Sequence, residues 1–159
     1  MHLELTEEQA LIQDTARRFS ETELAPIAAE LESPEKRPLY LEKPKQLADL
    51  GFMGLNVSSD YGGTGAGVVA FSVAVTEIAR SCASSALSMS VTNLVGEIIQ
   101  SIGSEAQKKY YIAKLCSGEY ASGAFCLSEA GAGSDPSGLK TRAVLDGDEW
   151  VLNGTKMWI

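Results

Sequence analysis

Residues 139–159 read LKTRAVLDGDEWVLNGTKMWI, and this stretch decides the class of fold. Apolar and polar side chains alternate through residues 139–145, which is the period of a β-strand with one covered face. Asp146-Gly147 and Asn153-Gly154 are dipeptides that favour tight hairpin turns. The stretch therefore predicts a meandering antiparallel sheet, with about four strands when the apolar segment before it is included.

Upstream of this stretch the apolar residues recur every three or four positions, as they do in helices. Thr6 with Gln9, and Ser104 with Gln107, have the spacing of a capping box at a helix start. Helices are predicted over residues 6–31 with a bend at Pro26, and over residues 44–50, 68–80, 86–102 and 105–115. The fold class is therefore a multi-domain α and β protein. Residues 1–118 form an all-α N-terminal domain, and residues 119–159 form the beginning of a β domain.

The charge and composition of the chain exclude several classes of partner. Lys and Arg number 13 against 21 Asp and Glu, which gives a net charge of -8, and the basic residues are scattered. A nucleic-acid surface needs clustered basic residues, so no nucleic-acid partner is expected. No apolar run reaches the roughly 18 residues of a membrane span, and the N-terminus lacks a secretory pattern. With three cysteines and no CxxC spacing, neither disulfides nor a metal site is expected. We expect a cytoplasmic protein, or a mitochondrial matrix protein if it is eukaryotic and processed.

Two glycine-rich stretches lack the GxGxxG spacing of a Rossmann nucleotide site: GGTGAG at 62–67 and GAGSDP at 131–136. The first is expected to be a connection between domains. The second follows a predicted strand, and its glycines would let backbone amides approach a ligand, with Ser128 and Ser134 as small hydrogen-bonding side chains. Composition alone leaves two interpretations open for it, a ligand-binding loop and an ordinary surface loop.

Residues 124–159, AFCLSEAGAGSDPSGLKTRAVLDGDEWVLNGTKMWI, resemble the central signature of the acyl-CoA dehydrogenase family. LGFMGLNVSSDYGGTGAG at 50–67 and GSEAQKKYYIAKLCSGE at 103–119 are similar to the N-terminal domain of that family, so the resemblance covers essentially the whole chain. Family members bind FAD without a Rossmann fold, between an N-terminal helical domain, a middle β domain and a C-terminal helical bundle. The resemblance implies that this chain is a fragment in which the β domain is truncated and the C-terminal bundle is missing.

The resemblance also implies roles for single residues. Leu127 and Ser128 match positions at the pyrimidine end of the flavin, Gly133 and Ser134 match positions near the pyrophosphate, and Trp158 matches the tryptophan beside the ring system. Ser134 also matches a contact to the CoA part of the substrate. The implied cofactor-binding set is Phe125, Cys126, Leu127, Ser128, Gly133, Ser134, Trp158 and Ile159. Ser128 stands where many relatives have threonine, and Ala130 replaces a frequent proline.

The implied activity is the α,β-dehydrogenation of an acyl-CoA thioester, by an oxidoreductase that acts on CH-CH groups in fatty acid or acyl-CoA metabolism. The implied partners are an electron-transfer flavoprotein and, in the full-length protein, further copies in a homotetramer. The catalytic base is expected in the missing C-terminal domain, so this chain has no catalytic residue and is expected to be inactive alone. Alternatives are a non-catalytic binding or assembly module of the same fold, and a related flavoenzyme such as an acyl-CoA oxidase or a nitroalkane oxidase.

Two reactive side chains in the motif receive structural interpretations. A catalytic base must reach the substrate α-carbon, and the carboxylate of the family lies in the C-terminal bundle, so Glu129 is expected to support the turn. Cys126 lacks a histidine partner that would activate a thiol, so it is expected to be a small core residue.

Overall fold

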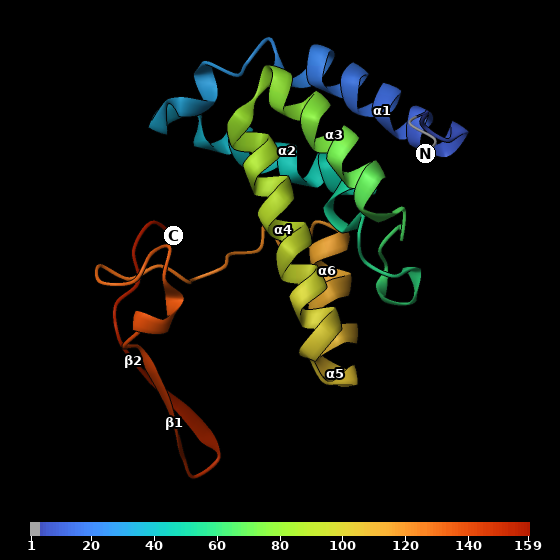
Figure 1. Ribbon diagram of the computed structural model, residues 1–159. Coiled ribbons are helices and arrows are strands. Elements are labelled where there is room, and N and C mark those ends of the chain that lie inside the picture. Colours follow the sequence, from blue (N-terminus) through green and yellow to red (C-terminus); the bar gives the residue numbers. More distant parts are fainter. Residues whose placement is uncertain (1–3) are drawn as a thin grey trace. The chain divides into compact units, whose positions relative to one another are not determined.

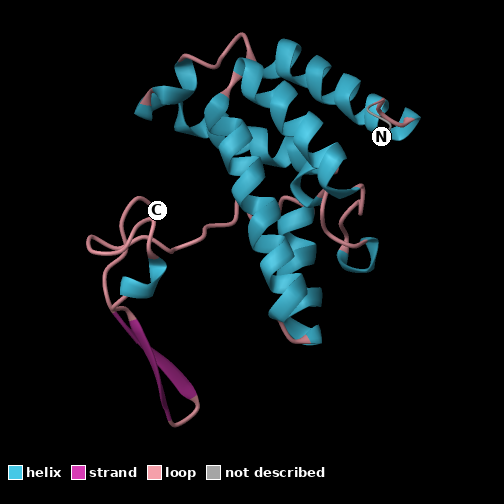
Figure 2. Cartoon of the chain, viewed as in Figure 1, coloured by secondary structure: helices cyan, strands magenta, loops and turns pink. Residues whose placement is uncertain are grey.

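A computed structural model describes residues 4–159, with the side chains of Glu32, Arg37 and Leu39 excepted. The chain divides into two compact units, Met1–Gly123 and Ala124–Ile159, here called the helical unit and the β unit. Figure 2 shows helices through the first and strands within the second. The predicted fold class, a helical N-terminal part followed by antiparallel strands, is confirmed. The domain boundary between residues 118 and 119 stays a prediction.

The described part of the helical unit contains six α-helices (Figure 1). They are α1 (Glu7–Phe19), α2 (Arg37–Asp49), α3 (Gly67–Ser81), α4 (Ala83–Ile102), α5 (Glu105–Gln107) and α6 (Ala113–Cys116). Helix α1 packs along α3, α3 packs against α4, and α2 lies against α4. No helix in the described residues combines the length and the apolar character that a membrane crossing requires.

Both predicted capping boxes are confirmed. The Thr6 hydroxyl accepts a hydrogen bond from the Gln9 amide at 3.2 Å, and the Gln9 side chain accepts one from the Thr6 amide at 3.1 Å. Ser104 and Gln107 repeat the arrangement at 3.3 and 2.8 Å. These bonds satisfy amide groups that have no partner inside the helix, so α1 and α5 begin where the sequence predicts.

Several helix boundaries differ from the prediction. Helix α4 begins at Ala83 and not at residue 86, and a π-helical turn at Lys108–Ile112 divides the helix predicted over residues 105–115. The α-helix α1 ends at Phe19 and continues as a π-helical turn over Ser20–Leu24, before Pro26. Proline lacks the amide that an α-helix needs, so the expected α-helix through residue 31 is wrong. Helix α2 begins at Arg37 and contains Pro44 in its interior, whereas the sequence placed its start at residue 44. The proline that suits a first helical turn is Pro38.

The core of the helical unit lies where α1, α2, α3 and α4 meet. Its fully covered side chains include Leu24, Leu47, Phe52, Met53, Leu55, Ile78 and Met89. The prediction that residues 62–67 connect domains is wrong, because they lie inside the helical unit, between Ser59–Tyr61 and the start of α3. They are packed tightly there, since a Cβ atom on Gly63 would lie 2.1 Å from the Val57 carbonyl oxygen. Gly63 therefore allows close contact with the protein's own backbone.

The β unit contains one antiparallel hairpin, β1 (Arg142–Asp146) and β2 (Glu149–Asn153). Gly147 has φ of 61° in the turn, which explains the Asp-Gly dipeptide. Leu145 pairs with Trp150 and Ala143 with Leu152, so these apolar side chains share one face of the hairpin. The expected covered face is not present, because every residue of both strands is exposed. The expectation of about four strands is wrong for the described residues, which form two. A strand needs a continuous ladder, and the segments at 124–128 and 155–159 share a single backbone hydrogen bond.

Candidate functional site

The structure brings together two of the sequence-predicted segments of the β unit. The Met157 amide donates a 2.8 Å hydrogen bond to the Ser128 carbonyl oxygen. Beside it, the Lys156 ammonium donates a 2.9 Å hydrogen bond to the Leu127 carbonyl oxygen. Leu127 and Ser128 are therefore held next to the residues that lead directly into Trp158.

Glu129 is the polar centre of this region. One carboxylate oxygen accepts hydrogen bonds from the Lys156 ammonium at 2.8 Å and the Thr141 amide at 3.0 Å, and the other accepts one from the Lys140 amide at 2.7 Å. The ammonium of Lys156, followed by hydrogen bonds from Thr141 and Lys140, lowers the pKa of Glu129 to about 2. A carboxylate that is ionised and fully engaged is a poor proton acceptor. The expected role of Glu129 in turn support is confirmed.

The glycine loop after Glu129 is shaped by its own backbone. Glu129 and Ala132 exchange amide-to-carbonyl hydrogen bonds of 3.0 and 3.1 Å. Asp135 then begins a short 3-10 turn, Pro136–Gly138, by accepting hydrogen bonds from the amide and hydroxyl of Ser137. A Cβ atom on Gly131 or Gly133 would meet nothing within 4 Å. The loop therefore presents open backbone to its surroundings.

Hydrogen-bonding and apolar groups are both available on this surface. Among the described residues, the hydroxyls of Ser128 and Ser134 have no hydrogen-bond partner. The side chains of Phe125 and Ile159 are exposed, and Trp158 is 89% exposed. Trp158 also has φ of 64°, which is uncommon for a bulky residue. Free hydroxyls, accessible glycine backbone and an exposed aromatic ring make a surface suited to a ligand with polar and flat aromatic parts.

One expectation about this region is wrong, and one residue was missed. Cys126 is exposed and is not a core residue, because the segment that carries it has no sheet partner to cover it. Lys156 joins Leu127 to Glu129, and neither the periodicity of the sequence nor a motif pointed to this role. Its partners lie far away in the chain, so spacing alone could not find them.

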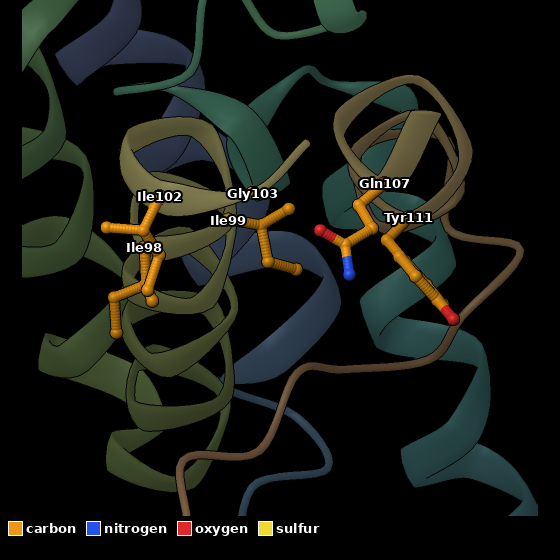
Figure 3. Close-up of a pocket in the computed structure, with 6 residues that line it drawn as sticks. All are labelled: Ile98, Ile99, Ile102, Gly103, Gln107 and Tyr111. Carbon is orange, nitrogen blue, oxygen red and sulfur yellow. The ribbon is translucent and has the colours of Figure 1, made fainter. Parts of the chain in front are cut away.

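A pocket in the helical unit is lined by none of the sequence-predicted site residues (Figure 3). Its volume is about 490 Å³, and it lies between the end of α4 and the helical run that follows. Six residues line it: Ile98, Ile99, Ile102, Gly103, Gln107 and Tyr111. The side-chain oxygen Oε1 of Gln107 already accepts a hydrogen bond from the Ser104 amide. The lining contains no ionisable group suited to proton transfer near neutral pH.

The chemistry that the described residues offer is binding and orientation. Residues 4–159 contain no group of three or more His, Cys, Asp or Glu side chains that could hold a metal ion. The buried thiol of Cys116 has its pKa raised to about 11 by desolvation, so it is a weak nucleophile. The region around Ser128, Ser134 and Trp158 is accordingly the candidate functional site.

Comparisons with known proteins identify relatives of the chain. Residues 6–119 match the family model for the acyl-CoA dehydrogenase N-terminal domain. The chain is 39% identical to the short-chain specific acyl-CoA dehydrogenase of Clostridium acetobutylicum, over 100% of this chain and 41% of that protein. Butyryl-CoA dehydrogenase from Megasphaera elsdenii is similar in structure, with a TM-score of 0.83, 34% identity, and coverage of 98% of this chain and 41% of that one. An acyl-CoA dehydrogenase from Bacillus anthracis, solved in complex with FAD, gives a TM-score of 0.87, 31% identity, and coverage of 98% and 26%. The chain thus spans at most 41% of the length of these three relatives.

Proposed function

Because the chain belongs to the acyl-CoA dehydrogenase family, we propose that it carries part of the FAD and substrate site of an enzyme that oxidises acyl-CoA thioesters between the α and β carbons. The observation that carries the proposal is the surface beside the Ser128 to Met157 hydrogen bond. It combines two free hydroxyls, open glycine backbone and the exposed ring of Trp158. FAD needs these three features, since it has hydrogen-bonding pyrimidine edges, a pyrophosphate and a flat ring system.

Each residue of the proposed site has a distinct task. Leu127 and Ser128 hydrogen-bond the pyrimidine end of the flavin, and Gly133 and Ser134 receive the pyrophosphate. Trp158 lies beside the ring system. Phe125, Cys126 and Ile159 complete the surface, and Ser134 also contacts the CoA part of the substrate. The residues fit these tasks because the glycine backbone is accessible and the hydroxyls have no other partner among the described residues.

The proposed contribution of this chain to the reaction is to bind and orient. Bound FAD supplies the acceptor for hydride from the β-carbon of the acyl chain. Donors aimed at the flavin favour the electron-rich form that develops, and Ser128 is positioned to be one. The base that takes the α-proton is assigned to no residue of this chain, and Glu129 is unsuited to the role because its carboxylate is ionised and engaged by three donors.

The substrate class and partners follow from the family. The relatives named above include a short-chain specific enzyme and a butyryl-CoA dehydrogenase, so we take short acyl-CoA thioesters as the first substrates to test. Electrons would pass to an electron-transfer flavoprotein, and the protein would assemble as a homotetramer. An acyl-CoA oxidase differs in passing electrons to oxygen, so the acceptor decides between the two enzymes.

The test uses the protein as its gene encodes it. The purified protein is titrated with FAD, and butyryl-CoA is then added without oxygen. We expect a yellow protein whose flavin absorption is bleached by butyryl-CoA and restored by an electron-transfer flavoprotein or a dye. A colourless protein that FAD cannot reconstitute would overturn the proposal. Rapid restoration by oxygen alone would replace the dehydrogenase by an oxidase.

A further inference from the structure

We propose that the ion pair between Glu129 and Lys156 is a clamp that positions the flavin-binding backbone, an inference that rests on the proposed function and deepens it. The clamp joins three separate segments of the β unit: residues 127–129, residues 140–141 and residue 156. Neither side chain is assigned a contact with FAD or substrate. Both act through the residues that they hold in place.

The first step is the geometry of the pair. Lys156 Nζ lies 2.8 Å from a Glu129 carboxylate oxygen and 2.9 Å from the Leu127 carbonyl oxygen, so one ammonium bridges two groups of the same segment. The Glu129 side chain is only 9% exposed. A charge-assisted pair that is shielded from water is stronger and more directional than an exposed surface pair.

The second step compares the clamp with the other contacts between the two flavin-binding segments, residues 124–128 and 155–159. The Met157 amide and the Ser128 carbonyl form the single backbone hydrogen bond between the two flavin-binding segments in the part of the chain that the structure describes. One neutral hydrogen bond shifts a population by only about 2-fold to 10-fold. The side chains beside it, those of Leu127, Ser128, Glu129, Lys156 and Met157, are only half-buried, and no apolar core cluster among the described residues includes them. The clamp is therefore the main constraint that keeps Ser128 next to the residues before Trp158.

The third step is the reach of the carboxylate. Glu129 also accepts hydrogen bonds from the Lys140 and Thr141 amides, just before β1. The same side chain thus fixes the end of the glycine loop and the start of the hairpin. A binding site that is held in its bound geometry loses less conformational freedom when its ligand arrives. Loss of the clamp should therefore weaken flavin binding without removing any flavin contact.

Four variants of the protein as its gene encodes it test the clamp. Lys156→Met removes the charge and keeps the length of the side chain, and Lys156→Arg restores charge and donors. Glu129→Gln keeps the size of the side chain and one oxygen acceptor, but it removes the negative charge. It therefore still tests the ion pair if Lys156→Met does not fold. Lys36→Met is the matched control, because it breaks one ion pair, that between Lys36 and Glu30, and both of its side chains are exposed.

We expect the FAD dissociation constant to rise about 10-fold in Lys156→Met and in Glu129→Gln, which is the loss typical of one charge-assisted hydrogen bond. Lys156→Arg should recover most of that affinity, and Lys36→Met should bind FAD as the wild type does. The loss in the double variant Lys156→Met/Glu129→Gln should be smaller than the sum of the two single losses, because both single variants remove the Glu129–Lys156 pair.

Hydrogen exchange of single amides separates this inference from the proposed function. The Met157 and Thr141 amides should exchange faster in Lys156→Met, whether or not FAD is present. Unchanged exchange at both amides would overturn the clamp, as would wild-type FAD affinity in Lys156→Met or failure of Lys156→Arg to restore it. A wild-type protein that binds no FAD would overturn the proposed function, and the exchange rates alone would then decide the clamp.

Discussion

The guanidinium of Arg17 on α1 donates two hydrogen bonds, of 3.1 and 3.3 Å, to the buried carboxylate of Glu77 on α3. The Glu77 side chain is 4% exposed, whereas that of Arg17 is 42% exposed. Gln13 on α1 and Arg80 on α3 complete the shell of donors around the same carboxylate. The contact of α1 with α3 is therefore polar at this point as well as apolar.

Replacing Arg17 should destabilise the helical unit. Arg17→Met removes two charge-assisted hydrogen bonds and leaves a buried carboxylate with weaker partners, so the free energy of unfolding should fall by about 1–3 kcal/mol. Arg18→Met is the control, because Arg18 is 67% exposed and pairs with the exposed Asp14. It should cost no more than about 1 kcal/mol. Chemical denaturation of both variants checks the difference, and equal losses would contradict it.

Acid should weaken the same contact. The hydrogen bond from Arg17 holds the pKa of Glu77 below its ordinary value of 4.5, although desolvation opposes it. A lowered folded pKa stabilises the fold fully above the unfolded pKa, and this contribution is lost as the pH falls below about 4.5. Glu77→Gln should be less stable at neutral pH and should lose less stability on acidification. Unfolding curves from neutral to acid pH test this, and two parallel profiles would refute it.

Asn93 should be the most sensitive polar position on α4. Its side chain is fully buried, donates to the carbonyl oxygens of Phe52 and Met89, and accepts from the Asn56 amide. Asn93→Ala removes the side-chain partner of the Phe52 carbonyl oxygen and of the Asn56 amide, and it should cost about 1–3 kcal/mol of unfolding free energy. Ser101→Ala on the exposed side of α4 should stay within about 0.5 kcal/mol. Thermal or chemical unfolding distinguishes the two.

Ser128→Ala should weaken FAD binding. The hydroxyl has no partner among the described residues, so its removal should leave the apoprotein fold unchanged. One neutral hydrogen bond to the flavin contributes about 0.5–1.5 kcal/mol, which corresponds to a several-fold rise in the FAD dissociation constant. Ser59→Ala, an exposed serine of the helical unit, should leave that constant unchanged. Equal affinities of the Ser128 variant and the wild type would remove Ser128 from the site.

Ser134→Ala should weaken the binding of the acyl-CoA substrate more than it slows turnover. A contact to the CoA part is present in both the ground state and the transition state, so its loss should raise the KM for acyl-CoA more than it lowers kcat. Steady-state kinetics with butyryl-CoA at saturating FAD measure both constants. A fall in kcat at constant KM would place Ser134 in the chemical step.

Features set by neighbouring residues were predictable from the sequence. The bonds of Thr6 with Gln9 and of Ser104 with Gln107 lie within one helical turn, and the turn at Gly147 depends on one dipeptide. Local chemistry alone determines such features. The family resemblance predicts a flavin site at residues 125–134 for a similar reason, because it depends only on the order of residues along the chain.

Features set by distant partners were not predictable. The π-helical turns at Ser20–Leu24 and Lys108–Ile112 insert residues into helices whose spacing looks regular. Pro44 lies inside α2 although an isolated helix would avoid it, because tertiary packing outweighs propensity. Lys156 meets Leu127 and Glu129 only after the chain has folded back. No spacing rule relates these positions.

The end of the helical unit is fastened by Thr92. The buried Thr92 hydroxyl accepts a 3.0 Å hydrogen bond from the Gly123 amide, and a Cβ atom at Gly123 would lie 2.8 Å from the Val95 side chain. Tyr120 is also held, because its amide donates to the Lys114 carbonyl oxygen and its ring lies under the Lys114 ammonium. The end of the helical unit is thus held at two points, by Gly123 against α4 and by Tyr120 against α6. A helical unit that is excised for separate study should therefore end after Gly123, so that both contacts are kept.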